Sequence, residues 1–80
     1  MPVGGKPIPT ECFLHGLDRW KVVGGQQVYR SKDKDRLYTW DALHGEVEVF
    51  NRAGWHLGAE DPASGRCIKD AVKGRRINVN

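Results

Sequence analysis

Apolar and polar residues alternate in short runs along most of the chain, which is the pattern of half-buried β-strands. In the clearest run, residues 46–50, two glutamates face one side of a strand and two valines face the other. Similar runs predict further strands at residues 20–23, 26–31, 36–40, 55–59, 66–69 and 75–79. No segment repeats its apolar residues at a helical spacing. The sequence therefore predicts a mainly β (α+β) fold, built on a small, highly twisted antiparallel β-sheet of five to seven strands.

The N-terminal residues lack this alternation. Residues 1–10 hold three of the four prolines and two glycines, which predicts an extended arm or linker before a domain at residues 11–80. Residues 10–16 predict one helical turn, with Thr10 as its N-cap and Gly16 at its end. Trp20, Trp40 and Trp55 are expected mainly in the core, and stacking on nucleic-acid bases is the alternative role.

Chain length and cysteine spacing exclude several classes of protein. A chain of 80 residues fits one small domain. No apolar run approaches the roughly 20 residues of a membrane-spanning helix, so we expect no membrane insertion. Cys12 and Cys67 have no C-x-x-C spacing, which excludes a cysteine zinc site and a disulfide-rich scaffold. Two buried free thiols are favoured over a single disulfide.

Charge is distributed unevenly along the chain. Residues 1–40 hold seven Lys/Arg against four acids, residues 41–61 one against five, and residues 62–80 five against one. A carboxylate cluster between basic flanks fits a site that binds a polyanion and also carries out acid–base chemistry on it. Ordinary surface charge is the alternative interpretation.

The densest chemical signal is the segment YTWDALHGEVEVF at residues 38–50. Four titratable side chains fall within eight residues: Asp41, His44, Glu46 and Glu48. Metal-free cleavage of RNA needs a base for the 2′-hydroxyl, an acid for the departing 5′-oxygen and a cation for the transition-state charge. A His–Glu pair can act as base and acid, and Arg75 or Arg76 can provide the cation. A metal site is the alternative, with ligands drawn from Asp41, His44, Glu46, Glu48 and His56, although their spacing fits no standard motif.

The strings WDALHGEVE (40–48), WHLG (55–58), DPASG (61–65) and RRI (75–77) resemble the cytotoxic domain of the ribosome-inactivating ribonuclease colicins and cloacin. Similar modules end the large polymorphic and contact-dependent growth inhibition toxins of bacteria. The resemblance covers about residues 36–79. It implies an enzyme that cuts small-subunit ribosomal RNA in the decoding centre without a metal or other cofactor, leaving a 2′,3′-cyclic phosphate.

The resemblance also implies a role for each matching residue. Glu48 would be the base, His44 the acid, Asp41 the group that orients the site, and Arg75 the phosphate clamp. Glu46 and His56 match positions of the family that line the same site. The C-terminal tail lacks the lysines of the colicins, so contact with the ribosome is expected to rely more on Lys32, Lys34, Arg36 and Lys73. Arg76 is expected to make a general phosphate contact.

The resemblance implies an acidic immunity protein as a partner and delivery as the C-terminal part of a larger toxin, which acts in the cytoplasm of the target bacterium. Two alternatives stay open. The first is a ribonuclease of the same chemistry that acts on tRNA or another RNA. The second is a non-catalytic β module that binds RNA through its tryptophans.

Overall fold

The structure is a computed structural model, and it describes residues 5–79. These residues form one antiparallel sheet of six strands in the order β1-β2-β3-β4-β5-β6, which confirms the predicted mainly β fold. The strands are β1 (Asp18–Val23), β2 (Gln26–Arg30), β3 (Arg36–Asp41), β4 (Glu46–Asn51), β5 (His56–Glu60) and β6 (Cys67–Asp70). The described helical structure is one 3₁₀ turn, η1 (Phe13–Gly16). Residues 5–79 contain no helix with the length and apolar character that spanning a membrane needs.

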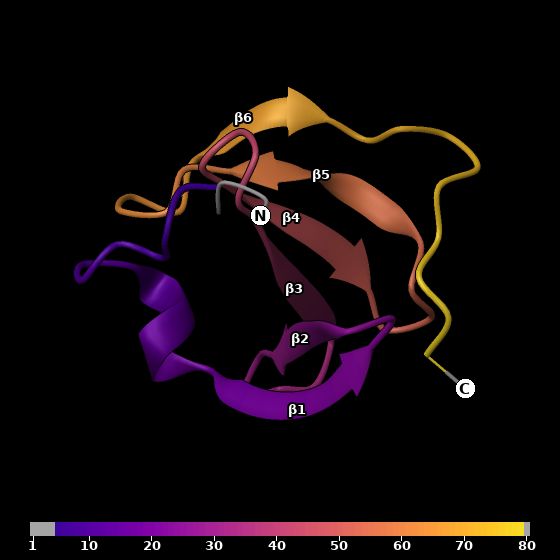
Figure 1. Cartoon of the computed structure of the whole chain (residues 1–80). Coiled ribbons are helices and arrows are strands. Elements are labelled where there is room, and N and C mark those ends of the chain that lie inside the picture. The colour runs from indigo at the N-terminus through magenta and orange to yellow at the C-terminus, as the bar shows by residue number, and fades with distance from the viewer. Residues whose placement is uncertain (1–4, 80) are drawn as a thin grey trace.

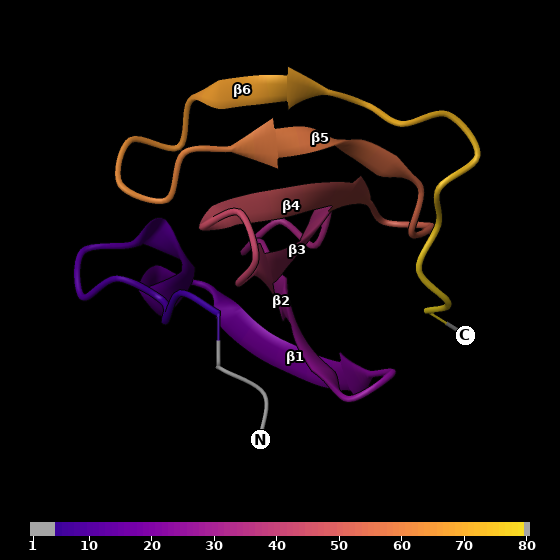
Figure 2. The same ribbon diagram turned by 45° about the horizontal axis from the view of Figure 1, so that its top comes forward.

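The strands follow the chain order, so each connection within the sheet is a hairpin. Figures 1 and 2 show the sheet curled into an arc with β1 and β6 at its two ends. The C-terminal tail, residues 71–79, leaves β6 and returns across the open side of the arc toward β1 (Figure 1). There the Nζ of Lys21 donates a hydrogen bond of 2.7 Å to the carbonyl of Val79. The tail thus joins the two ends of the curled sheet.

The prediction of a strand at residues 75–79 is wrong. The tail forms one isolated bridge, between Arg76 and Trp55, and no continuous ladder. The backbone of the tail forms two hydrogen bonds of 2.9 Å: His56 N–H donates to the Arg75 carbonyl, and Ile77 N–H donates to the Gly54 carbonyl. Beyond them the tail leaves residues 54 and 56 and reaches β1. Alternation in the sequence cannot distinguish such a crossing segment from a strand.

Each face of the sheet carries its own small core. On one face, Leu14 of η1 and its N-cap residue Cys12 are buried against Val47 of β4. On the other face, Val28, Leu37 and Phe50 are buried beneath the tail, with Ile77 and Val79 packed against them. Alternation along β3 and β4 separates the two sets, as the glutamates and valines of residues 46–49 predict.

The N-terminal residues differ from the prediction at the cap of the helical turn. Thr10 does not cap the helical turn, because η1 begins at Phe13 with Cys12 as an extended N-cap that makes no side-chain hydrogen bond. Residues 1–4 of the predicted arm lie outside the described residues, but residues 5–10 contact the sheet. Lys6 N–H donates to the Ala42 carbonyl, and the Trp40 indole N–H donates to the Lys6 carbonyl, each at 2.7 Å. This segment therefore holds the loop between β3 and β4 (the β3–β4 loop).

The tryptophans and one cysteine lie nearer the surface than expected. Trp55 is 47% exposed, while Trp20 and Trp40 are half-buried at the edges of the two cores. Aliphatic side chains and Phe50 already fill the narrow interior of the curled sheet. Both cysteines are free, as favoured, and Cys12 is buried. Cys67 is exposed, because it lies on β6 at the edge of the sheet, so its predicted burial is wrong.

Candidate active site

A cleft of about 520 Å³ opens between the β3–β4 loop, the middle of the sheet and the tail. It lies on the sheet face that also carries Leu37 and Phe50. Thr39 lies two residues after Leu37 on β3, and Glu48 lies two residues before Phe50 on β4, so all four side chains point to the same face. The lining residues are Gln26, Thr39, Trp40, Asp41, Ala42, Leu43, His44, Glu48, His56, Lys69, Asp70, Val72 and Arg75.

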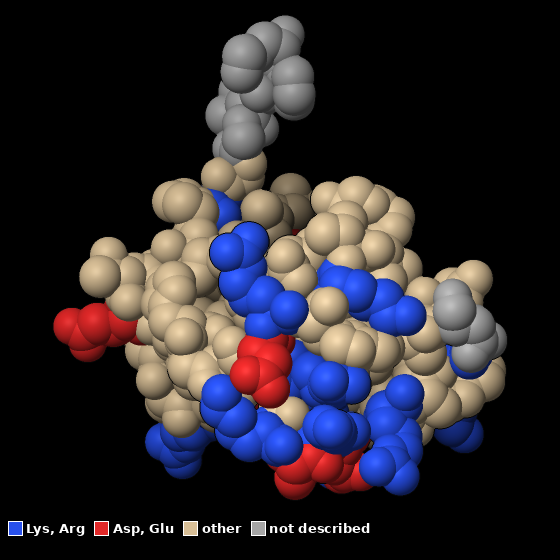
Figure 3. All heavy atoms as spheres, turned by 90° about the horizontal axis from the view of Figure 1, so that it is seen from below, with Lys and Arg blue, Asp and Glu red and all other residues tan. Residues whose placement is uncertain are grey.

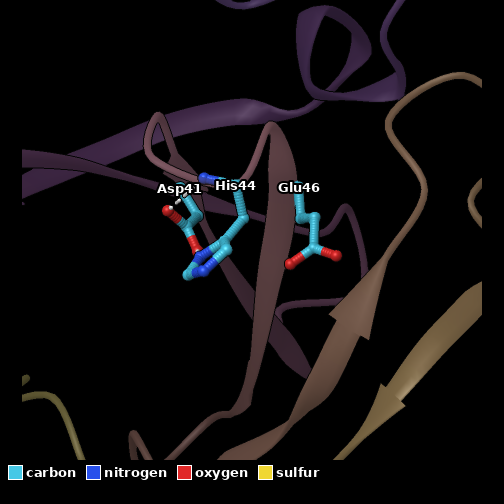
Figure 4. A group of neighbouring side chains, drawn as sticks. All are labelled: Asp41, His44 and Glu46. Atoms are coloured by element: carbon cyan, nitrogen blue, oxygen red, sulfur yellow. Dashed lines mark hydrogen bonds and ion pairs between the residues drawn. The ribbon is translucent and has the colours of Figure 1, made fainter. Parts of the chain in front are cut away.

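Asp41 organises the β3–β4 loop. One carboxylate oxygen, Oδ1, accepts hydrogen bonds from the backbone N–H groups of Leu43 (3.0 Å) and His44 (3.1 Å). The other, Oδ2, lies 2.7 Å from Nδ1 of the His44 ring (Figure 4). Partial burial acts to raise the pKa of Asp41, but the hydrogen bonds from the His44 ring and from the backbone outweigh it and hold this pKa below its ordinary value.

The same contact fixes how His44 can act. With Nδ1–H donating to Asp41, any proton that the ring passes to a ligand must leave from Nε2. Within residues 5–79, Nε2 has no hydrogen-bond partner, and the His44 side chain is 54% exposed at the cleft. His44 is thus an oriented imidazole with one nitrogen open to a substrate.

Glu48 is buried at the centre of β4, with 7% of the residue exposed. Its Oε1 accepts a hydrogen bond of 2.8 Å from the guanidinium of Arg75, and its Oε2 lies 3.2 Å from Nε2 of His56. The His56 ring accepts the backbone N–H of Val72 at Nδ1 (2.9 Å), so its proton lies on Nε2 and donates to Glu48. Each oxygen of this carboxylate is therefore held by a donor of known direction.

Glu46 lies beside His44 on the same strand face as Glu48 (Figure 4). It forms an ion pair of 2.8 Å with the Nζ of Lys69 on β6. This hydrogen bond, aided by the charges of Glu46, Glu48 and Asp41, raises the pKa of Lys69. Lys69 lines the cleft and was missed by the sequence analysis. Its position depends on two bulges, which shift the β4–β5 and β5–β6 registers.

The cleft brings together Asp41, His44, Glu48, His56 and Arg75, with Glu46 next to them. Three further predicted contact residues lie elsewhere. Arg36 faces the other side of the sheet, in a second cleft of about 270 Å³ that Val49 and Glu60 also line. Arg76 lies over the Trp55 ring (5.4 Å) and donates to the Ala53 carbonyl (3.0 Å). Lys73 is exposed and does not line the cleft.

Fewer residues are placed to ligate a metal ion together than the sequence suggested. Asp41, His44 and Glu46 each place one ligand atom within 4.8 Å of the others (Figure 4). Glu48 and His56 instead bond to each other. A metal at the first three residues would compete with Nδ1–H of His44 for Asp41 and with the ammonium group of Lys69 for Glu46. The contacts present favour proton chemistry at these residues.

Comparison with known proteins gives the family. The family model named Cytotoxic matches residues 18–78. Cloacin from Escherichia coli is 41% identical over 56 residues, which is 68% of this chain and 10% of cloacin. Colicin E3 and colicin E6 from the same species are 39% and 38% identical over the same length. The chain spans about a tenth of the length of each of these relatives. The matched region contains every strand of the sheet and the tail as far as Asn78. The chain therefore belongs to the Cytotoxic family of toxin domains.

Proposed function

We propose that this domain is an endoribonuclease that cleaves small-subunit ribosomal RNA in the decoding centre without a metal, and so blocks translation. The observation that supports it most is the buried Glu48 held between His56 and Arg75, in a cleft that also exposes Nε2 of His44. A carboxylate, an imidazole and a guanidinium in one cleft are the three groups that phosphodiester cleavage by the neighbouring hydroxyl requires.

In the proposed reaction, Glu48 takes the proton of the ribose 2′-hydroxyl, and the 2′-oxygen attacks the adjacent phosphorus. The bond from phosphorus to the 5′-oxygen breaks as His44 gives its Nε2 proton to that oxygen. Arg75 stabilises the additional negative charge of the transition state, since a guanidinium matches two phosphate oxygens at once. The products are a 2′,3′-cyclic phosphate and a 5′-hydroxyl. Asp41 keeps the His44 ring in the orientation for this transfer.

The surface charge supports a polyanionic substrate. Lys and Arg side chains outnumber acidic ones on the β1 side of the molecule (Figure 3), and the chain has a formal net charge of +3. The same charge suits an acidic immunity protein as the partner that protects the producing cell. We further propose that the domain is the C-terminal part of a larger toxin and acts in the cytoplasm of the target bacterium.

The test is to add the purified domain to intact ribosomes and map the cleavage by primer extension. A single stop in the decoding centre, with a cyclic phosphate at the new 3′ end, is the expected result. Stops confined to other RNAs such as tRNA would support the alternative substrate. A shift of RNA on a gel without cleavage would support a binding module.

Two further arms of this experiment address the chemistry. His44→Ala and Glu48→Gln should each lower the rate by about 10²–10⁴-fold, the usual effect of removing a positioned acid or base. Circular dichroism checks that each variant is folded. Cleavage should persist in EDTA while the ribosomes stay intact. If EDTA abolishes cleavage and one divalent metal restores it, the metal-free mechanism is wrong.

A further inference from the structure

The cleft contains one cation that the proposed reaction does not use. Lys69 lines the same cleft as Glu48 and Arg75, and its Nζ lies 2.8 Å from Oε1 of Glu46. An ammonium group has three N–H donors, and Glu46 accepts one of them. Since the Lys69 side chain is 52% exposed, the other donors are available to a molecule in the cleft.

The position of Lys69 follows from a row of residues across three strands. Lys69 on β6 pairs with Ala59 on β5, and Ala59 pairs with Glu48 on β4. Ala59 is 1% exposed and has the smallest side chain of the row, so the long side chains on either side extend above it into the cleft. Lys69 therefore enters the cleft from β6, whereas Arg75 enters it from the tail.

The charges in the cleft favour a role for a second cation. Its lining holds the acids Asp41, Glu48 and Asp70, and its permanent cations are Lys69 and Arg75. Arg75 is bound to Glu48 until that carboxylate takes a proton, so its attraction for phosphate grows as the reaction proceeds. An RNA phosphate that enters beforehand needs another positive partner, because the nearby carboxylates repel it.

We propose that Lys69 binds the substrate phosphate in the ground state, while Arg75 stabilises the transition state. This inference rests on the proposed ribonuclease function. Glu46 is then a positioning residue, which holds the ammonium group of Lys69 at the cleft through their 2.8 Å ion pair. Lys69 determines how tightly RNA binds, and Arg75 determines how fast it is cut.

The experiment compares Lys69→Met with Arg66→Met. Each change removes one positive charge near the start of β6, but Arg66 is exposed and lines neither cleft. Binding is measured with an RNA whose 2′-oxygens are methylated and cannot attack, and cleavage with the unmodified RNA. Lys69→Met should raise both Kd and KM on the order of 10-fold, the effect of losing one charged hydrogen bond, with a much smaller change in kcat.

Salt provides an independent measure of the same contact. The slope of log Kobs against log salt concentration is negative, and it should become shallower by about 0.7 in Lys69→Met, the value for one phosphate contact on a single strand. Lys69→Arg should retain most of the binding, and Arg66→Met should match the wild type in Kd and kcat. Unchanged KM and salt slope in a folded Lys69→Met protein would overturn the proposal.

A double variant distinguishes phosphate binding from simple neutralisation of Glu46. If Lys69 only neutralised Glu46, Glu46→Gln combined with Lys69→Met would restore the wild-type KM, and the proposal would be wrong. If Lys69 binds phosphate, the double variant stays defective in binding. A wild-type protein that binds the methylated RNA but cuts no RNA would refute the proposed function alone, because the binding comparison at Lys69 does not depend on cleavage.

Discussion

Gly54 links the stability of the domain to the placement of its catalytic arginine, and its replacement by alanine tests that link. Gly54 is buried and has a φ of +92°, in the left-handed region that residues with a Cβ avoid. A Cβ at this position would overlap the carbonyl oxygen of Ile77 in the tail. The hydrogen bond from Ile77 N–H to the Gly54 carbonyl (2.9 Å) would be lost as the tail moves away.

The expected cost is the sum of two effects. The left-handed backbone costs an alanine about 1–2 kcal/mol, and the lost hydrogen bond about 0.5–1.5 kcal/mol. Gly54→Ala should therefore lower the free energy of unfolding by about 1.5–3.5 kcal/mol, which corresponds to a fall in Tm of about 6–28 °C for a domain of this size. Thermal unfolding followed by circular dichroism measures it.

Gly25→Ala is the matched control. Gly25 has a φ of +80°, but no heavy atom beyond its two chain neighbours lies within 4 Å of where its Cβ would be. It should show the backbone cost of about 1–2 kcal/mol and keep full cleavage activity below its Tm. Gly54→Ala should lose activity even when folded, since Arg75 lies two residues before Ile77 on the displaced tail. Equal losses of stability and activity in the two variants would refute this reasoning.

Three other predictions concern the cleft and its support. Arg75→Lys keeps the charge but loses the bidentate contact of a guanidinium with phosphate, so it should lower kcat more than it weakens RNA binding. Arg76→Ala loses only its contacts to Trp55 and Ala53, so it should leave kcat close to the wild-type value. The pKa of Asp41 is lowered on folding, so the stability difference between wild type and Asp41→Asn should be fully present above pH 4 and should shrink as the pH falls through the lowered pKa. Urea unfolding at several pH values measures this difference. A difference that grows on acidification would contradict the assignment. Trp40→Phe removes the 2.7 Å hydrogen bond to the Lys6 carbonyl and should cost about 1 kcal/mol, with faster amide exchange in the β3–β4 loop than in the β1–β2 hairpin.

The parts of the molecule that could be predicted are those determined by neighbours in the chain. Alternation over residues 46–49 gave the two faces of β4 correctly, because side-chain direction in a strand depends only on position. Asp41, His44 and Glu46 lie within six residues, and a loop leading into a strand suffices to bring them to one place. The antiparallel sheet could be predicted for the same reason, since each strand pairs with the next one along the chain.

The parts that could not be predicted depend on contacts between distant residues. The residues of the tail and Lys69 reach the cleft only after two bulges have shifted the strand registers. The sequence does not show where a bulge falls. Arg75 was identified only through the resemblance to colicins, since neither charge nor alternation distinguishes it from Arg76. The 47% exposure of Trp55 depends in turn on the course of the tail, which bridges its backbone at Arg76 and places only that guanidinium over its ring.

The closure of the tail onto β1 has a consequence for the order of folding. The ladders join strands that are consecutive in the chain, whereas the hydrogen bond from Lys21 to Val79 spans 58 residues. Contacts that close long loops have the largest entropic cost and are favoured only once local structure has formed. We therefore expect the six-stranded sheet to assemble before the tail docks. Until then Glu48 lacks Arg75, so a refolding molecule acquires its β structure first and its capacity to cut RNA afterwards.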